Sequence, residues 1–237
     1  MDKSDVLIKQ FHSDHYLNHN LKRLQHLDSL NIDFNNKSVL ELGAGIGDHT
    51  DFLLSKNISE ILVTDARKEN LDYLNKKYQD NKRVEVAFLD MEMPLKLEKK
   101  YDIIYCYGLL YHLSNPEKAI VFMGEHCKYY LLLETSVSFG DNETINLCDE
   151  NINNPSQAFS GKGCRPTRIW VNKQLKKYFR HIYMPITQPD HEEFPIDWLI
   201  KENHKAKHAR SIFIASNIKL NNLLLTENIP YKQNRFC

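Results

Sequence analysis

The stretch Val39-Leu-Glu-Leu-Gly-Ala-Gly-Ile-Gly47 decides the fold of this chain. A short apolar run at 38–42 leads into three glycines, and a segment with helical character follows at 48–56. Because glycine lets the backbone turn tightly and approach a ligand closely, this order predicts a buried strand, a ligand-binding loop and a helix. The dinucleotide-binding fingerprint is G-x-G-x-x-G. Here the spacing is G-x-G-x-G, and an acidic residue, Glu41, precedes it.

Predicted strands and helices alternate after this loop. Strand patterns recur at 60–64, 84–89, 101–106 and 129–133, and an amphipathic helix at 68–78 separates the first two. Such alternation is typical of a parallel sheet with helices on both faces. We therefore predict an α/β fold with a Rossmann-like, mostly parallel sheet, which strands near 182 and at 212–215 complete.

A single domain is predicted over residues 1–237, because the sequence has no internal repeat and no low-complexity linker. In this prediction residues 1–35 form a helical cap, 37–135 form the core, and 136–237 supply a substrate loop and the last part of the sheet. The stretch 134–165 is rich in Asn, Ser, Asp and Gly. A loop of that length inside a compact domain is usually functional or disordered.

The composition argues against several classes of protein. Lys+Arg and Asp+Glu both total 31, so the chain lacks the basic surplus of a general nucleic-acid binder. The five cysteines form no C-x-x-C pair, which disfavours zinc and disulfides and favours reduced thiols in a cytoplasmic protein. The N-terminus has no apolar signal-peptide core, and no run of about 18 apolar residues occurs, so no membrane segment is expected.

Acidic residues stand at the ends of the second and third predicted strands. Asp65, followed by Ala66, ends the second strand, and Asp90, followed by Met91, ends the third. The carboxyl ends of parallel strands meet where open α/β sheets bind their ligands. A carboxylate at Asp65 suits the hydroxyls of an unphosphorylated ribose. Asp90 could accept from an adenine amino group while Met91 packs on the ring.

These motifs, in this order, resemble those of class I S-adenosylmethionine (SAM)-dependent methyltransferases over about residues 37–135. The resemblance implies an enzyme that uses SAM and releases S-adenosylhomocysteine (SAH), with a sheet that ends in an antiparallel hairpin. It also implies that Gly43, Ala44 and Gly45 line the methionine part of SAM. The full set of predicted cofactor contacts is Tyr16, Arg23, Glu41, Gly43, Ala44, Gly45, Asp65, Ala66, Asp90, Met91 and Tyr107.

The segment Tyr107-Gly-Leu-Leu-Tyr-His-Leu-Ser-Asn-Pro116 follows the fourth predicted strand. It resembles a Gly-x-Leu-Tyr-His-Leu-x-x-Pro segment of several such methyltransferases, including enzymes that modify wobble uridine in tRNA. Histidine titrates near neutrality, so His112 is the candidate general base when the nucleophile is a hydroxyl. The alternative is a structural hydrogen bond. Tyr111 is a predicted wall of the acceptor site.

The C-terminal half carries the predicted acceptor contacts. Gly161-Lys-Gly-Cys-Arg-Pro-Thr-Arg168 places cations around glycines at a helix start, where Arg165 and Arg168 could bind an anion or simply be solvated. Glu134 and His191 are further predicted acceptor contacts. No metal site is predicted, because the adjacent residues His191, Glu192 and Glu193 rarely converge on one ion.

The N-terminal helix predicted at 6–30 has two faces. Leu17, Leu21, Leu24 and Leu27 form an apolar face at helical spacing. Tyr16, His19, Asn20 and Arg23 form a neighbouring polar face, which is either solvated or lies over the cofactor.

Nearly the whole chain resembles one group of bacterial methyltransferases, some of which are linked to the modification of saccharides or natural products. The resulting prediction is O-methylation of a small anionic or saccharide-type acceptor, such as a sugar or sugar phosphate. A tRNA-modifying enzyme, a SAM-binding protein without activity and a dehydrogenase are the alternatives. The chain is expected to act on a small molecule without membrane or nucleic-acid partners, and a homodimer is left open.

Overall fold

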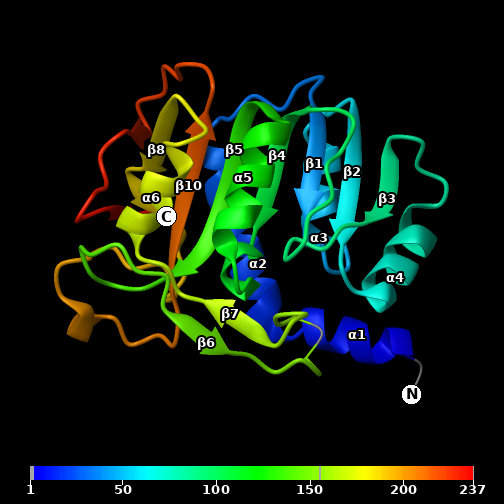
Figure 1. The fold of residues 1–237 in the computed structure, drawn as a ribbon, viewed down its shortest axis with the longest axis horizontal. Coiled ribbons are helices and arrows are strands. Elements are labelled where there is room, and N and C mark those ends of the chain that lie inside the picture. The colour runs from blue at the N-terminus through cyan, green and yellow to red at the C-terminus, as the bar shows by residue number, and fades with distance from the viewer. Residues whose placement is uncertain (1–2, 155, 237) are drawn as a thin grey trace.

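A computed structural model describes residues 3–154 and 156–236 of the chain. Its centre is an eight-stranded sheet with the strand order β11-β8-β10-β5-β4-β1-β2-β3 (Figure 1). The pairs from β3 to β5 are parallel, whereas β10 runs antiparallel to both β5 and β8, and β11 runs antiparallel to β8. This is the predicted α/β class, with its mostly parallel sheet and a C-terminal antiparallel strand.

The strands of this sheet are β1 (Ser38–Leu42), β2 (Glu60–Asp65), β3 (Val84–Phe88), β4 (Tyr101–Tyr107), β5 (Cys127–Val137), β8 (His181–Pro185), β10 (Ala209–Ser216) and β11 (Leu225–Thr226). The helices are α1 (Lys3–Phe11), α2 (Asp14–Ser29), α3 (Asp48–Ser55), α4 (Lys68–Tyr78), α5 (Pro116–His126) and α6 (Arg168–Leu175), with short 3-10 turns η1 (Leu110–His112) and η2 (Lys201–Asn203). Two small sheets pair β6 (Leu147–Asp149) with β7 (Lys162–Cys164) and β9 (Thr187–Gln188) with β12 (Asn234–Arg235).

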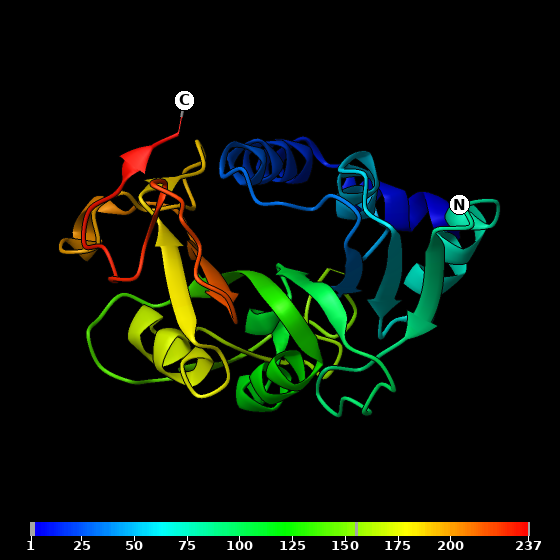
Figure 2. The same ribbon diagram turned by 90° about the horizontal axis from the view of Figure 1, so that it is seen from above.

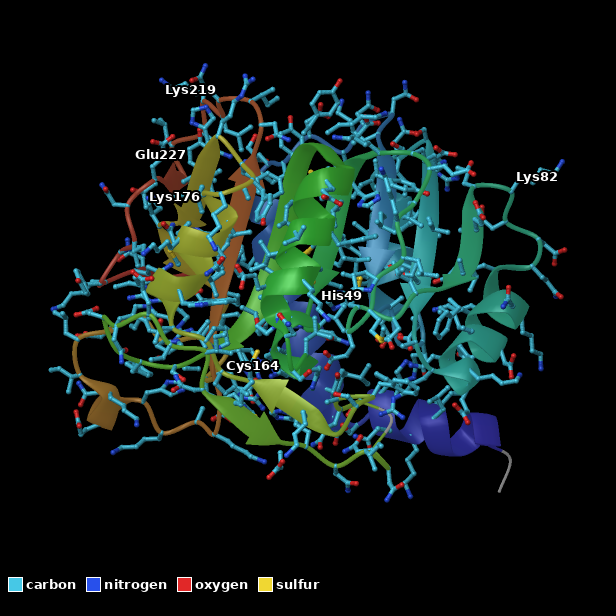
Figure 3. All side chains as sticks on the ribbon, viewed as in Figure 1. His49, Lys82, Cys164, Lys176, Lys219 and Glu227 are labelled. Atoms are coloured by element: carbon cyan, nitrogen blue, oxygen red, sulfur yellow. The ribbon has the colours of Figure 1, made fainter. Side chains whose placement is uncertain are left out.

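Helices cover both faces of the large sheet (Figure 2). On one face, α5 and α6 bury Ile120 and Val171 against the sheet, and on the other, α2, α3 and α4 bury Leu27, Leu53 and Leu74. Every residue of β1 is buried, as expected for a central parallel strand whose two faces are both covered. Charged side chains such as Lys82, Lys219 and Glu227 point outward at the periphery (Figure 3).

The predicted N-terminal helix at 6–30 is two helices, because the chain breaks at residues 12–13. Ser13 has extended backbone angles (φ −65°, ψ 149°) and begins α2 as its N-cap residue. The second helix is tied to a distant part of the chain: Lys22 pairs with Asp190 at 3.0 Å, and Nε2 of His26 lies 3.0 Å from the Thr187 hydroxyl. The cap over the sheet is therefore built from both ends of the sequence.

The stretch predicted as a long loop at 134–165 is partly ordered into strands. It contains the end of β5 and the β6–β7 hairpin, which lies with α1 near the carboxyl ends of the parallel strands (Figure 1). The Arg67 guanidinium donates to backbone carbonyls of residues 152, 154, 157 and 158, and so holds the tip of this hairpin over the end of β2. The stretch is thus an ordered cover rather than an open loop.

None of the helices in the described ranges is long and apolar enough to cross a membrane. Cys106, Cys127, Cys148 and Cys164 are free thiols, while Cys237 lies outside the described residues. Cys164 is fully buried at the end of β7 (Figure 3). Cys148 is partly exposed.

Candidate functional site

The glycine loop between β1 and α3 takes a backbone path that few residues other than glycine adopt. Gly43, Gly45 and Gly47 all have positive φ, at +68°, +59° and +80°. A Cβ atom on Gly45 would lie 2.9 Å from Cε1 of Phe11, so the aromatic ring of α1 packs directly on the loop. The N-terminal helix therefore covers the glycine loop, and Phe11 is a site residue that the sequence analysis missed.

Asp65 links the end of β2 to this loop. Its two carboxylate oxygens accept from the backbone N–H groups of Gly45 and Arg67, at 2.9 and 2.8 Å. Burial raises the pKa of Asp65, and these hydrogen bonds lower it. A cavity of about 100 Å³ beside this carboxylate is lined by Ala66, Asp90 and Met91 among others. The strand-end residues predicted to hold ribose and adenine are thus brought together around one hollow.

A larger cavity of about 720 Å³ adjoins the first, and the residues that line both are Phe11, Tyr16, Gly43, Gly45, Gly108, His112, Ser156 and Gln157. Ten of the predicted site residues line it: Tyr16, Arg23, Glu41, Gly43, Ala44, Gly45, Tyr107, Tyr111, His112 and Arg165. Its far side is formed by residues 204 and 206–210, a segment that the sequence analysis did not single out. The remaining wall includes His15, His19, His49, Glu150, Glu193 and Arg210.

Two predicted cofactor residues stand out in the wall of this cavity. The Tyr107 hydroxyl is buried and has no hydrogen-bond partner among the described residues, so it is available to a ligand. Its ring stacks on that of Tyr105, with centroids 4.6 Å apart. Glu41 accepts from the Thr50 hydroxyl at 2.6 Å, and burial raises its pKa to about 8. Glu41 therefore offers a carboxyl group that titrates near neutral pH.

His112 forms a dyad with Glu150 of the hairpin segment: Nδ1 of its ring contacts Oε2 of the carboxylate. Burial lowers the pKa of His112, and the neighbouring carboxylate raises it again in part. Burial of Glu150 opposes its ionisation, yet the contacts to His112, Ala158 and Arg165 lower its pKa to about 2. At neutral pH the pair is therefore a carboxylate that fixes a neutral imidazole, which is the state a general base needs.

Four charged side chains form a buried network beneath the large cavity. Glu134 accepts from Arg23 at 2.7 Å and from Arg210 at 3.1 Å, and Arg210 also donates to Glu193 at 2.6 Å. Glu134 has no exposed side-chain surface, and it is absent from the described residues that line the cavity. Glu134, which is predicted to contact the acceptor, thus lies outside the cavity wall and holds two arginines with its two oxygens.

Tyr111 is sandwiched between two guanidinium groups. The Arg165 and Arg210 carbons lie 5.1 and 4.8 Å from the centre of its ring, and Arg210 also donates to its hydroxyl at 3.2 Å. Arg165 in turn donates to Glu150 at 3.0 Å and to two backbone carbonyls. Each arginine of the cavity is therefore paired with a carboxylate, so the wall is polar but close to electrically neutral.

Arg168, which is predicted to contact the acceptor, makes its contacts within the protein. Its guanidinium donates to the Pro230 carbonyl at 2.7 Å and stacks 3.8 Å from the centre of the Trp198 ring. Neither cavity includes it among its described lining residues. Arg165 and Arg168 diverge because Thr167, between them, begins helix α6 and turns the chain.

The polar face of α2 is the buried one. His19, Asn20 and Arg23 are buried, whereas Leu17 and Leu21 of the predicted apolar face are 44% and 53% exposed. The partners of the polar face come from far along the chain, so no local pattern could reveal them. His191 likewise does not appear among the described lining residues of the cavity. It lies behind the wall, where its ring packs against that of His19 with centroids 4.8 Å apart.

One comparison with known proteins matches the part of the chain that carries the glycine loop. Residues 39–128 match the family model of a methyltransferase domain. A tRNA U34 carboxymethyltransferase of Nautilia profundicola is 24% identical over 177 residues, which is 73% of this chain and 58% of that protein. The chain thus spans under two thirds of the length of this curated relative.

Solved structures share the fold over nearly the full chain. The N-terminal domain of EvdMO1, determined with SAH and D-fucose, covers 91% of this chain and 97% of its own, with 19% identity and a TM-score of 0.62. A SAM-dependent methyltransferase from Mesorhizobium loti covers 84% and 99%, with 11% identity and a TM-score of 0.60. Residues 39–128 thus match a methyltransferase domain, and the chain shares the fold of SAM-dependent methyltransferases.

Proposed function

We propose that this enzyme transfers the methyl group of SAM to a hydroxyl of a small, saccharide-type acceptor. The observation that carries the proposal is the His112–Glu150 dyad in the wall of a cavity of about 720 Å³ that adjoins the glycine loop. Such a cavity is of the size that small ligands occupy. The dyad supplies a base where a hydroxyl would meet the methyl group.

The residues around the glycine loop fit SAM. The positive φ angles of Gly43 and Gly45 leave backbone space for the methionine part, and the partnerless Tyr107 hydroxyl offers a buried hydrogen bond. Asp65 and Asp90 line the smaller cavity, where ribose hydroxyls and an adenine amino group need acceptors. When bound there, SAM supplies an electrophilic methyl group to the adjoining cavity.

The work of the protein is then to position the acceptor and remove its proton. Because Glu150 is ionised and can only accept, Nδ1 of His112 carries the proton of the neutral ring. Nε2 keeps its lone pair and takes the hydroxyl proton as the oxygen attacks. The acceptor oxygen, the methyl carbon and the departing sulfur must lie in line, so the cavity walls contribute mainly by orientation.

The charge balance of the cavity favours a polyhydroxyl acceptor over a strongly anionic one. Arg23, Arg165 and Arg210 each pair with a carboxylate, so no guanidinium among them is left to neutralise a phosphate alone. Paired guanidinium and carboxylate groups offer donors and acceptors side by side, which suits sugar hydroxyls. The D-fucose found with the similar EvdMO1 domain supports the same class of acceptor.

Modification of tRNA is the second candidate, and the tRNA U34 carboxymethyltransferase relative favours it. The formal net charge of zero opposes it, because tRNA binding relies on phosphate contacts by a basic surface. A binding experiment with tRNA at low salt separates the two candidates. Micromolar tRNA binding that weakens steeply with salt would support the second candidate against the first.

The test of the first candidate is methyl transfer from radiolabelled SAM to a panel of neutral sugars, sugar phosphates and bulk tRNA. We expect incorporation into a neutral or weakly anionic saccharide, and none with His112→Asn at matched SAH affinity. Exclusive incorporation into tRNA would refute the acceptor class. Incorporation into none of these pools, by protein that binds SAH, would favour a SAM-binding protein without activity.

A further inference from the structure

Three ligand-type side chains converge at the wall of the large cavity, where His19 and Glu193 line the cavity and His191 lies behind them. One ligand atom each from His19, His191 and Glu193 lies within 4.8 Å of the other two, and all three residues are buried. His19 comes from α2, while the other two come from the segment that follows β9. His19 and His191, which are 172 positions apart in the sequence, thus come together, and the sequence alone could not reveal this.

One atom of this cluster lacks the partner that its burial calls for. Nε2 of His19 is buried and has no hydrogen bond among the described residues, and its nearest carboxylate oxygen, on Glu193, is 3.7 Å away. The side chain of His19 is only 5% exposed. An unsatisfied buried nitrogen of this kind is uncommon and points to a missing ligand.

The geometry and chemistry of the cluster point to a metal ion. We propose that His19, His191 and Glu193 bind one divalent transition-metal ion, with Zn²⁺ as the expected occupant. Two imidazoles and one carboxylate form a donor set that Zn²⁺ takes in sites with three protein ligands and one open position. The absence of thiolates and of further carboxylates disfavours Cu(I) and Ca²⁺.

The hydrogen bonds already made by the cluster leave room for the ion. Arg210 donates to Oε2 of Glu193, so Oε1 remains available as a ligand. The N–H of Glu193 donates to Nδ1 of His191 at 3.2 Å, a long bond that the ring gives up when either nitrogen binds a metal. The positive charges of Arg23 and Arg210 oppose a cation, and the two carboxylates of Glu134 and Glu193 together balance them.

The open position of the ion would face the large cavity. His19 and Glu193 both line that cavity, and so does His15, whose Nε2 lies 3.9 Å from Oε1 of Glu193. A metal ion lowers the pKa of a bound water or hydroxyl and orients it. The site therefore goes beyond the proposed general base, because it gives a second group that could hold or polarise an acceptor oxygen.

Metal binding is tested on the whole protein after treatment with a chelator. We expect calorimetry with ZnCl₂ to show about one ion per chain, and Co²⁺ to give the visible absorption of a low-coordinate site with nitrogen ligands. His19→Ala and His191→Ala should each weaken binding by at least ~10-fold, as loss of ligand support typically does. His181→Ala is the matched control, because His181 lies on β8, away from the cluster, and pairs with Glu227.

The outcomes separate cleanly. Binding that survives unchanged in both cluster variants, or wild-type protein that binds neither Zn²⁺ nor Co²⁺, would overturn the proposal. SAH affinity of each variant, measured in the same preparations, reports whether the protein is folded. If His19→Ala fails to fold, His191→Ala and the Co²⁺ spectrum of the wild type decide the matter. Because none of the predicted SAH contacts belongs to this cluster, failure here leaves the methyltransferase proposal standing.

Discussion

The ring of His112 is fixed by the carboxylate of Glu150, although the two residues lie 38 positions apart in the chain. The histidine belongs to η1 at the end of β4, and the carboxylate belongs to the cover formed around the β6–β7 hairpin. The base is therefore aligned only when the cover is seated on the sheet. Activity and closure of the cavity are expected to depend on the same contact.

Replacing His112 by asparagine removes the proposed base and keeps a polar side chain in the wall that the two cavities share. His112→Asn should lower kcat by ~10²–10⁴-fold, the usual contribution of a positioned acid or base. SAH affinity should stay within about threefold of wild type, which calorimetry measures. His181→Asn serves as the control. A kcat close to the wild-type value would reassign His112 to a structural role.

The pH profile reports the state of the dyad. Burial lowers the pKa of His112, so its ring becomes neutral at a lower pH than an ordinary histidine does. We therefore expect kcat to rise with pH and to reach its plateau below about pH 6.5. In Glu150→Gln the charge that raises this pKa is lost, so the rising limb should move to lower pH while the plateau falls. Glu227→Gln, at an exposed pair with His181, is the control. A shift to higher pH would contradict the assignment of Glu150.

Asp65 is expected to be the strongest single determinant of cofactor affinity. Asp65→Ala removes a buried acceptor of charged hydrogen bonds and should weaken SAH binding by ~10–100-fold. It also frees the Gly45 N–H that the carboxylate now holds. Asp72→Ala, on the exposed face of α4, should leave SAH affinity unchanged. Equal affinities in the two variants would argue against the placement of ribose at Asp65.

The aromatic ring of Phe11 closes the glycine loop from above. Phe11→Ala should weaken SAH binding by about tenfold, because a buried phenyl group contributes ~1.5–3 kcal/mol and part of this protects the cofactor. Leu17→Ala removes an exposed apolar side chain from the next helix and is the control. Thermal unfolding of both variants without ligand shows whether weaker SAH binding comes from the missing ring or from a destabilised fold. Unchanged SAH affinity in Phe11→Ala would show that α1 does not cover the cofactor.

The two arginines that flank Thr167 are expected to separate in mutagenesis. Arg168→Ala should reduce stability by ~1–3 kcal/mol, through the lost Trp198 stack and Pro230 contact, with no change in acceptor KM. Arg165→Ala should instead raise acceptor KM, because Arg165 lines the cavity and holds both Tyr111 and Glu150. Denaturant unfolding and acceptor kinetics measure the two effects. A higher acceptor KM in Arg168→Ala, with an unchanged KM in Arg165→Ala, would instead support Arg168 as an acceptor contact.

The half of the site that lies on the sheet could be predicted from the sequence. Glycines 43, 45 and 47, Asp65 and Asp90 follow directly from strand ends, because parallel strands deliver their carboxyl ends to one edge. The order of these signals also predicts the class of fold. Local patterns carry this information since each residue is placed by the strand that it ends.

The other half of the site could not be predicted, because its residues are placed by contacts across long distances in the sequence. Arg23 reads as a solvated residue on a polar helix face until Glu134 is known to lie beneath it. His19 is buried by a segment more than 170 positions away. Leu17 and Leu21 are left exposed although Leu27 of the same predicted face is fully buried, so a rule that turns apolar faces inward fails for the first half of this helix.

The roof of the large cavity is built jointly by the two ends of the chain, through contacts such as Lys22–Asp190 and His26–Thr187. The sheet between them supplies the cofactor loop, and the segment after β4 supplies Tyr111 and His112. We therefore expect that acceptor preference can be transferred between relatives only by exchanging two segments together, residues 1–30 and residues 187–210. A chimera that exchanges one segment alone would join unmatched partners and lose the shape of the cavity before it gained a new specificity.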